Sequence, residues 1–326
     1  MSTYQPVIRA FFADDSTQTA PAARTWHGPA GGVAYDEAGI RAWLMDLRRP
    51  IYVVRGPDGR TGVTGEGQEY SGSNGAGGFT LLATAPALPA ARLGDATFKQ
   101  AYGLQYALYA GAMANAIASV EMVTTLGKGG LLGSFGAAGL PPTRLEDAIT
   151  RIQAALPDGP YAFNLIHSPF DPAMEHRAVD LYLKYAVNLI EASAFLDITP
   201  ALVRYRLAGL SQAPDGSVIT RNRVIAKLSR KEVAARFLAP APADLVQQLL
   251  AEGKITPLQA QLAARVAMAD DITVEADSGG HTDNRPLTGL VPTMIAVRDE
   301  LQGKYQFAQQ VRVGAAGGIS TPGAAL

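Results

Sequence analysis

The chain has 326 residues, which is enough for one large α/β domain or for two smaller domains. Hydrophobic residues make up 48% of the sequence and charged residues 17%, as expected of a globular protein with an apolar interior. The formal net charge of −1 argues against a nucleic-acid partner, and the count of zero cysteines excludes disulfides, thiolate metal sites and cysteine nucleophiles.

The first residues of the chain lack the basic start and the apolar segment of a secretion signal, so the expected location is the cytoplasm. The longest uncharged run, residues 100–120, is long enough to span a bilayer, but polar side chains and two glycines interrupt it. We therefore expect a buried strand and the start of a helix there, and no association with a membrane.

Residues 1 to about 95 are predicted to form a separate N-terminal module that contains β-structure. Residues 26–29 and the glycine-rich tract 62–78 look like loops. Between the apolar residues 51–54 and 62–64, the dipeptide Asp58-Gly59 predicts the turn of a β-hairpin.

From residue 96 to residue 326, short apolar runs alternate with helical ones, which is typical of repeated βα units around a parallel sheet. Seven strands are predicted, at residues 105–110, 130–135, 161–166, 187–192, 223–228, 272–276 and 311–316. Helices are expected between them, at residues 145–155, 177–185, 201–207, 230–237 and 292–301. Because no Gly-x-Gly-x-x-Gly turn follows the first strand, we predict an α/β fold of the (β/α)8 TIM-barrel type rather than a doubly wound sheet.

An extra segment, about residues 239–267, lies between the fifth and the sixth predicted strands. Its leucines and valines recur at helical spacing, which predicts an inserted helical hairpin. The apolar stripe could cover the mouth of the barrel or a partner, but an ordinary packing face is the favoured interpretation.

The carboxyl ends of the strands are where barrels of this type place their chemistry. These ends carry glycine-rich segments, few nucleophiles and several polar side chains: Gly111, Ala112, Met113, Ser134, Asn164, Glu191, Lys227, Glu275, Asp277, Gly279, Gly280, His281, Gly317 and Gly318. The set suits a flat cofactor, and the Gly-Gly pair after the seventh strand resembles a backbone cradle for phosphate. The sequence contains no motif for a metal site, a phosphate-binding loop of the Walker type or a catalytic triad.

Five segments, in the right order, resemble the flavin-dependent enoyl reductase and nitronate monooxygenase superfamily. They resemble more closely its PfaD-type branch, which serves polyunsaturated fatty acid and trans-acyltransferase polyketide synthases. The segments are residues 109–115, 129–136, 163–169, 275–283 and 315–319. The resemblance implies a barrel that binds FMN and receives electrons from NAD(P)H.

The resemblance also implies roles for single residues. Gly111, Ala112, Met113 and Asn164 border the flavin, Glu275 belongs to the motif that approaches it with Gly279 and Gly280, and Gly317 and Gly318 hold its phosphate. His281 matches the active-site histidine of the superfamily.

His281 is the predicted acid that protonates the α carbon of an enoyl thioester after hydride reaches the β carbon. Asp277 or Asp283 could orient this histidine or raise its pKa, and each is equally plausible as a loop-capping aspartate. Lys227 could face the negatively charged part of a reduced flavin, or it could extend to solvent beside Arg230.

The predicted function is that of an FMN-dependent enoyl reductase acting on acyl carrier protein, within a synthase. The alternatives are a nitronate monooxygenase and a non-catalytic scaffold subunit. Expected partners are acyl carrier protein domains and other synthase subunits, with a homodimer as a further possible assembly. The superfamily barrel has an eighth strand, whereas this sequence stops at Leu326 after the seventh, so a truncated chain is expected.

Overall fold

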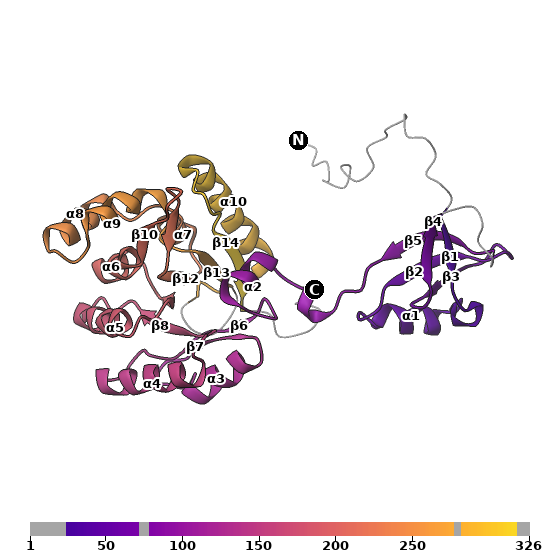
Figure 1. Ribbon diagram of the computed structural model, residues 1–326, viewed down its shortest axis with the longest axis horizontal. Helices are drawn as coiled ribbons and strands as arrows, with labels where there is room; N and C mark the ends of the chain where they lie inside the picture. Colours follow the sequence, from indigo (N-terminus) through magenta and orange to yellow (C-terminus); the bar gives the residue numbers. More distant parts are fainter. Residues whose placement is uncertain (1–23, 72–77, 277–281, 318–326) are drawn as a thin grey trace. The chain divides into compact units, whose positions relative to one another are not determined.

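The computed structural model describes residues 24–71, 78–276 and 282–317. The chain divides into two compact units, Met1–Leu93 and Gly94–Leu326 (Figure 1). Within the described ranges, no helix combines the length and the apolar character that crossing a membrane requires.

The first unit contains an antiparallel sheet of five strands in the order β3-β2-β5-β1-β4. The strands are β1 (Arg24–His27), β2 (Ile51–Arg55), β3 (Thr61–Thr64), β4 (Gln68–Ser71) and β5 (Thr80–Ala85), and the helix α1 spans Glu37–Met45. The predicted hairpin is confirmed, because Tyr52 pairs with Thr64 and Arg55 with Thr61 across β2 and β3.

Two segments that were expected to be loops contain strands, and in both the expectation is wrong. Trp26 lies in β1 with 1% of its surface exposed, and its ring meets Phe79 edge-on at a centroid distance of 5.2 Å. Part of the glycine-rich tract forms β4, which pairs with β1. Pairing and burial of a large aromatic side chain outweigh the local preference of glycine for turns.

The second unit is a curled parallel sheet of seven strands in the order β14-β13-β12-β9-β8-β7-β6. The strands are β6 (Tyr109–Ala110), β7 (Leu132–Phe135), β8 (Ala162–Ile166), β9 (Leu189–Ser193), β12 (Arg223–Leu228), β13 (Asp271–Glu275) and β14 (Arg312–Ala316). All seven predicted strands are present, and the barrel-type α/β fold class is confirmed.

Helix α2 (Ala96–Tyr102) precedes β6, and the helices that follow the strands lie in an arc outside the sheet (Figure 1). The helices outside the sheet are α3 (Val120–Lys128), α4 (Pro142–Ala155), α5 (Pro172–Lys184), α6 (Pro200–Ala208), α7 (Lys231–Phe237), α8 (Ala243–Ala251), α9 (Pro257–Leu262) and α10 (Leu287–Tyr305). The predicted inserted hairpin corresponds to α8 and α9, and the short strands β10 (Leu210–Gln212) and β11 (Val218–Thr220) precede β12. Helices α4, α5 and α6 begin earlier than predicted, each with a proline that is pre-organised for the first helical position.

The two faces of the curled sheet differ because successive side chains of a strand point to opposite sides. On the outer face, apolar residues such as Phe163, Ile190 and Val224 join the main core under the helices. On the inner face, Leu132, Ala162, Leu189 and Ile225 form a smaller apolar layer together with side chains from α2 and the start of β6. The inner-face residues that follow this apolar layer on the same strands, toward their carboxyl ends, pack directly above it.

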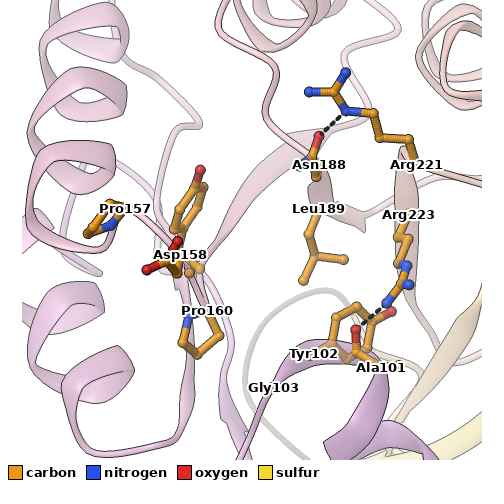
Figure 2. A pocket seen from close by; sticks show the side chains of 12 residues that line it. Ala101, Tyr102, Gly103, Pro157, Asp158, Pro160, Asn188, Leu189, Arg221 and Arg223 are labelled. Atoms are coloured by element: carbon orange, nitrogen blue, oxygen red, sulfur yellow. Dashed lines mark hydrogen bonds between the residues drawn. The ribbon is translucent and has the colours of Figure 1, made fainter.

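Helix α2 closes the inner face at the amino ends of the strands. The hydroxyl of Tyr102 donates a hydrogen bond to the carboxylate of Asp271, and Arg312 forms two further bonds to the same carboxylate, at 2.6 and 2.8 Å. Burial raises the pKa of Asp271, although Arg312 and Tyr102 oppose this effect. A pocket lined by Tyr102, Asn188, Arg221 and other residues opens at this end (Figure 2), away from the carboxyl ends of the strands.

Replacing Arg312 by Met should destabilise the second unit by about 3 kcal/mol, because it leaves the buried Asp271 carboxylate without its cation. The loss of the cation raises the pKa of Asp271 further above its ordinary value of 3.8 in the folded state. An acid that holds its proton more tightly when folded loses stability as the pH rises, so urea unfolding should show a larger penalty at pH 7 than at pH 4. Arg151→Met, which breaks an exposed pair with Glu121, is the control; an equal penalty for both variants would contradict this account.

Candidate active site

A layer of polar side chains lies on the inner face, one step closer to the carboxyl ends of the strands than the apolar layer. Ser134, Asn164, Glu191 and Lys227 each follow, two residues later, a member of the apolar layer on β7, β8, β9 and β12. Asn164 pairs with Glu191 in the sheet register, and Lys227 pairs with Ser193. The spacing of two places each of these side chains on the inner face, next to a member of the apolar layer on the same strand.

Lys227 lies between two carboxylates. Its Nζ atom is 3.2 Å from Oε1 of Glu191 and 3.0 Å from Oε1 of Glu275, and its side chain is 15% exposed. Burial opposes the charged form of Lys227, but the two carboxylates outweigh burial and raise its pKa. The solvent-facing interpretation of Lys227 is therefore wrong, and this lysine is a cation held inside the barrel.

Glu191 connects this charged group to the loop after β6. It is fully buried and accepts hydrogen bonds from the backbone N–H of Ala112 at 3.0 Å and from the hydroxyl of Ser193 at 3.2 Å. A Cβ atom at Gly111 would lie 3.2 Å from Nζ of Lys227, so the loop passes directly over the charges. The sequence indicates Glu191 only as one of several residues at the strand ends. An acidic residue inside an otherwise apolar strand is the one feature of the sequence that points to a buried charge here.

Asn164 is held by the same network. Its amide nitrogen donates to the backbone oxygen of Glu191 at 3.2 Å and to the hydroxyl of Ser193 at 2.9 Å. Its carbonyl oxygen Oδ1 accepts no hydrogen bond from the residues that the structure describes. The group that Asn164 can present to a ligand is therefore an acceptor.

The loop after β6, which contains Met113, is also held against Gly136, the residue that follows β7. The N–H of Ala116 donates to the carbonyl of Gly136 at 2.9 Å, and the N–H of Gly136 donates to Ala118 at 3.0 Å. A Cβ atom at Gly136 would come within 1.7 Å of the carbonyl oxygen of Met113. Only glycine permits this approach, which explains the last glycine of the motif at residues 129–136.

Ser134 has a buried hydroxyl that pairs with no group among the described residues, and the residue is 1% exposed. Its neighbour Gly133 faces α3, since a Cβ there would meet Val123, so Ser134 points to the inner face. Buried hydroxyls without a partner are rare in folded proteins and indicate a missing ligand or water. Together with Oδ1 of Asn164 and the loop at Gly111, this hydroxyl fits a flat heterocycle with polar edges.

Several predicted site residues lie outside the described residues: His281, Asp277, Gly279, Gly280 and Gly318. Their proposed roles stay predictions. Asp283 is described, and its carboxylate pairs with Arg230 at 3.2 Å. Gly317, directly after β14, has a positive φ of 76°, a conformation that favours glycine.

A histidine and a buried glutamate join the loops after β8 and β9. Nδ1 of His167 is 3.0 Å from Oε1 of Glu175, and the His167 ring stacks on Phe195 at 5.2 Å. Glu175 also accepts from the N–H of Ser168 at 2.7 Å and from the hydroxyl of Thr199 at 2.7 Å. These bonds fix the loops beside the polar layer, and no sequence motif pointed to Glu175.

Comparisons with known proteins agree on one family. Residues 26–87 match the family model of the fatty acid synthase subunit PfaD N-terminal domain. The chain is 47% identical over 300 residues to a polyunsaturated fatty acid synthase protein of Thraustochytrium sp., a match that covers 91% of this chain and 19% of that protein. It is 50% identical over 240 residues to the polyketide biosynthesis protein PksE of Bacillus subtilis, covering 73% of this chain and 31% of that protein.

One solved structure is also similar in sequence. It is the enoyl reductase domain of MlnA, from the macrolactin biosynthesis cluster of Bacillus amyloliquefaciens. The TM-score is 0.70 and the identity 43%, over 73% of this chain and 54% of that chain. This chain therefore spans about half of that protein and less than a third of the two curated relatives.

Replacing Lys227 by Met should destabilise the second unit by about 3 to 5 kcal/mol, because two partly or fully buried carboxylates lose their shared cation. Urea unfolding at pH 7 measures the loss. Lys184→Met is the matched control, since Lys184 forms an exposed pair with Glu146 at 2.7 Å, and its effect should be much smaller. Equal stabilities of the Lys227 variant and the parent protein would show that the cluster contributes nothing to the fold.

Proposed function

Because this chain belongs to the PfaD-type family of synthase proteins, we propose that it is an FMN-dependent enoyl reductase. The proposed substrates are enoyl groups carried on acyl carrier protein, and the proposed electron donor is NAD(P)H. The observation that supports the proposal most is the polar layer at the carboxyl ends of the strands, where the Ser134 hydroxyl has no partner among the residues that the structure describes. In barrels of this type, ligands and chemistry occupy that end.

The described residues fit a flavin ring system. The Ser134 hydroxyl and Oδ1 of Asn164 offer hydrogen bonds to its polar edges, and the backbone at Gly111 offers close approach without a Cβ atom. Gly317 is proposed to contact the phosphate. Bound FMN would supply the hydride that reaches the β carbon of the enoyl group.

A proton must also reach the α carbon, and the described neighbours are poor donors. The pKa of Lys227 is raised by its two carboxylates despite burial, and burial raises the pKa of the Tyr109 phenol, which donates to Thr273 at 2.8 Å. Both groups hold their protons near neutral pH. We therefore retain His281 as the proposed acid, with Asp277 as its proposed partner.

The proposed partners follow from the family relationship. The relatives are named as a fatty acid synthase subunit and as a polyketide biosynthesis protein, so we propose that this chain works beside other synthase subunits and acyl carrier protein domains. The N-terminal module, residues 1 to about 95, is proposed as a separate domain. A homodimer is a further proposal.

The function is tested by following NAD(P)H oxidation with a crotonyl group on acyl carrier protein, for the parent protein and for His281→Ala. The parent should turn over the enoyl substrate. The variant should keep its FMN, because no ring contact is assigned to the imidazole, and should reduce the substrate at least about 100-fold more slowly, as expected for loss of a general acid.

His176→Ala, on helix α5, is the control and should retain parental activity. Unchanged turnover in the His281 variant would remove this histidine as the acid. A parent protein that leaves the enoyl substrate untouched, but consumes oxygen with an alkyl nitronate, would replace the proposed function by that of a monooxygenase.

A further inference from the structure

The charges of the described group Glu191, Lys227 and Glu275 do not balance. Glu191 and Glu275 contribute two negative charges and Lys227 one positive charge, so the cluster carries a net charge of −1. Glu191 is fully buried, and the side chains of Lys227 and Glu275 are 15% and 17% exposed. Water screens such charges weakly, so their field reaches the neighbouring groups.

The excess charge lies next to the segment that is proposed to border the flavin. Glu191 accepts the N–H of Ala112 at 3.0 Å, and Gly111 lies over Nζ of Lys227 without a side chain between them. Without the carboxylates, Lys227 would give the electrostatic potential at Gly111 a positive sign. Glu275, at 3.0 Å, already neutralises the charge of Lys227. The carboxylate of Glu191 therefore makes the net charge of the cluster negative.

We propose that Glu191 lowers the reduction potential of the bound flavin by leaving the buried cluster with a net negative charge. Reduction adds electrons to the flavin, and a nearby negative charge opposes that addition. Glu191 is thus a tuning residue rather than a catalytic residue, since its contacts are with Lys227, Ala112 and Ser193. The inference rests on the proposed function in that it requires bound FMN.

A lower potential has a direct chemical meaning for the proposed reaction. It makes the reduced flavin a stronger hydride donor toward the enoyl β carbon, and it makes reduction of the flavin by NAD(P)H correspondingly less favourable. Glu191 therefore makes reduction of the flavin by NAD(P)H less favourable and reduction of the enoyl group by the flavin more favourable.

The experiment measures the midpoint potential of the bound flavin by equilibration with a reference dye, in the parent protein and in Glu191→Gln. Glutamine has nearly the same shape and still accepts the N–H of Ala112, so the variant removes charge with little change of shape. The potential should shift upward, with the equilibrium moving toward reduced flavin by roughly tenfold or more, the order expected for one weakly screened charge. Glu275→Gln removes the same charge on the other side of Lys227 and should shift the potential in the same direction.

Glu146→Gln is the control, because Glu146 pairs with Lys184 on the surface of α4, and it should leave the potential unchanged. A flavin potential in Glu191→Gln equal to or below that of the parent would overturn the inference. If Glu191→Gln loses its flavin, the flavin potential of Glu275→Gln is used instead: a value above that of the parent supports the inference, and a value equal to or below it overturns the inference. A parent protein without any flavin would instead refute the proposed function, so the two failures are distinguishable.

Discussion

The position of Lys227 between Glu191 and Glu275 is the interaction on which the candidate site depends. A buried ammonium group must be paired, and here both partners are supplied by neighbouring strands of one sheet. Glu191 is in turn held by Ala112 and Ser193, and Ser193 accepts from Asn164. One buried carboxylate thereby fixes a loop, a cation and an amide before any ligand arrives, which is the kind of pre-organisation that a binding site requires.

Buried charged side chains are paired differently at the two ends of the barrel. At the amino end, Arg312 and Asp271 form a one-to-one pair with two hydrogen bonds, and Tyr102 covers it. At the carboxyl end, Glu191 and Glu275 share the single cation Lys227, and Ser134 has no partner among the described residues. The balanced ion pair stabilises the fold, whereas an acid-rich group beside a hydroxyl that pairs with none of the described residues indicates a place where a ligand completes the structure.

The parallel sheet could be predicted because its strands are buried on both faces and appear as short apolar runs between helices. Polar positions on the inner face were recognisable as strand ends, but their partners were not. Nothing in the local sequence distinguishes a Lys227 that extends to solvent from one that lies between two glutamates, because the neighbours come from β9 and β13. Likewise, the burial of Trp26 depends on Phe79, which is distant in the sequence, so residues 26–29 resembled a loop.

The central claim, that the polar layer is a flavin site, is tested most directly by the absorbance spectrum of the purified chain, with chromatography of any flavin released on denaturation. The account predicts a yellow protein that releases about one FMN per chain. Ser134→Ala should weaken the retention of this flavin, since the buried hydroxyl then cannot form the bond that completes the layer. A colourless protein that also fails to take up added FMN would contradict the account.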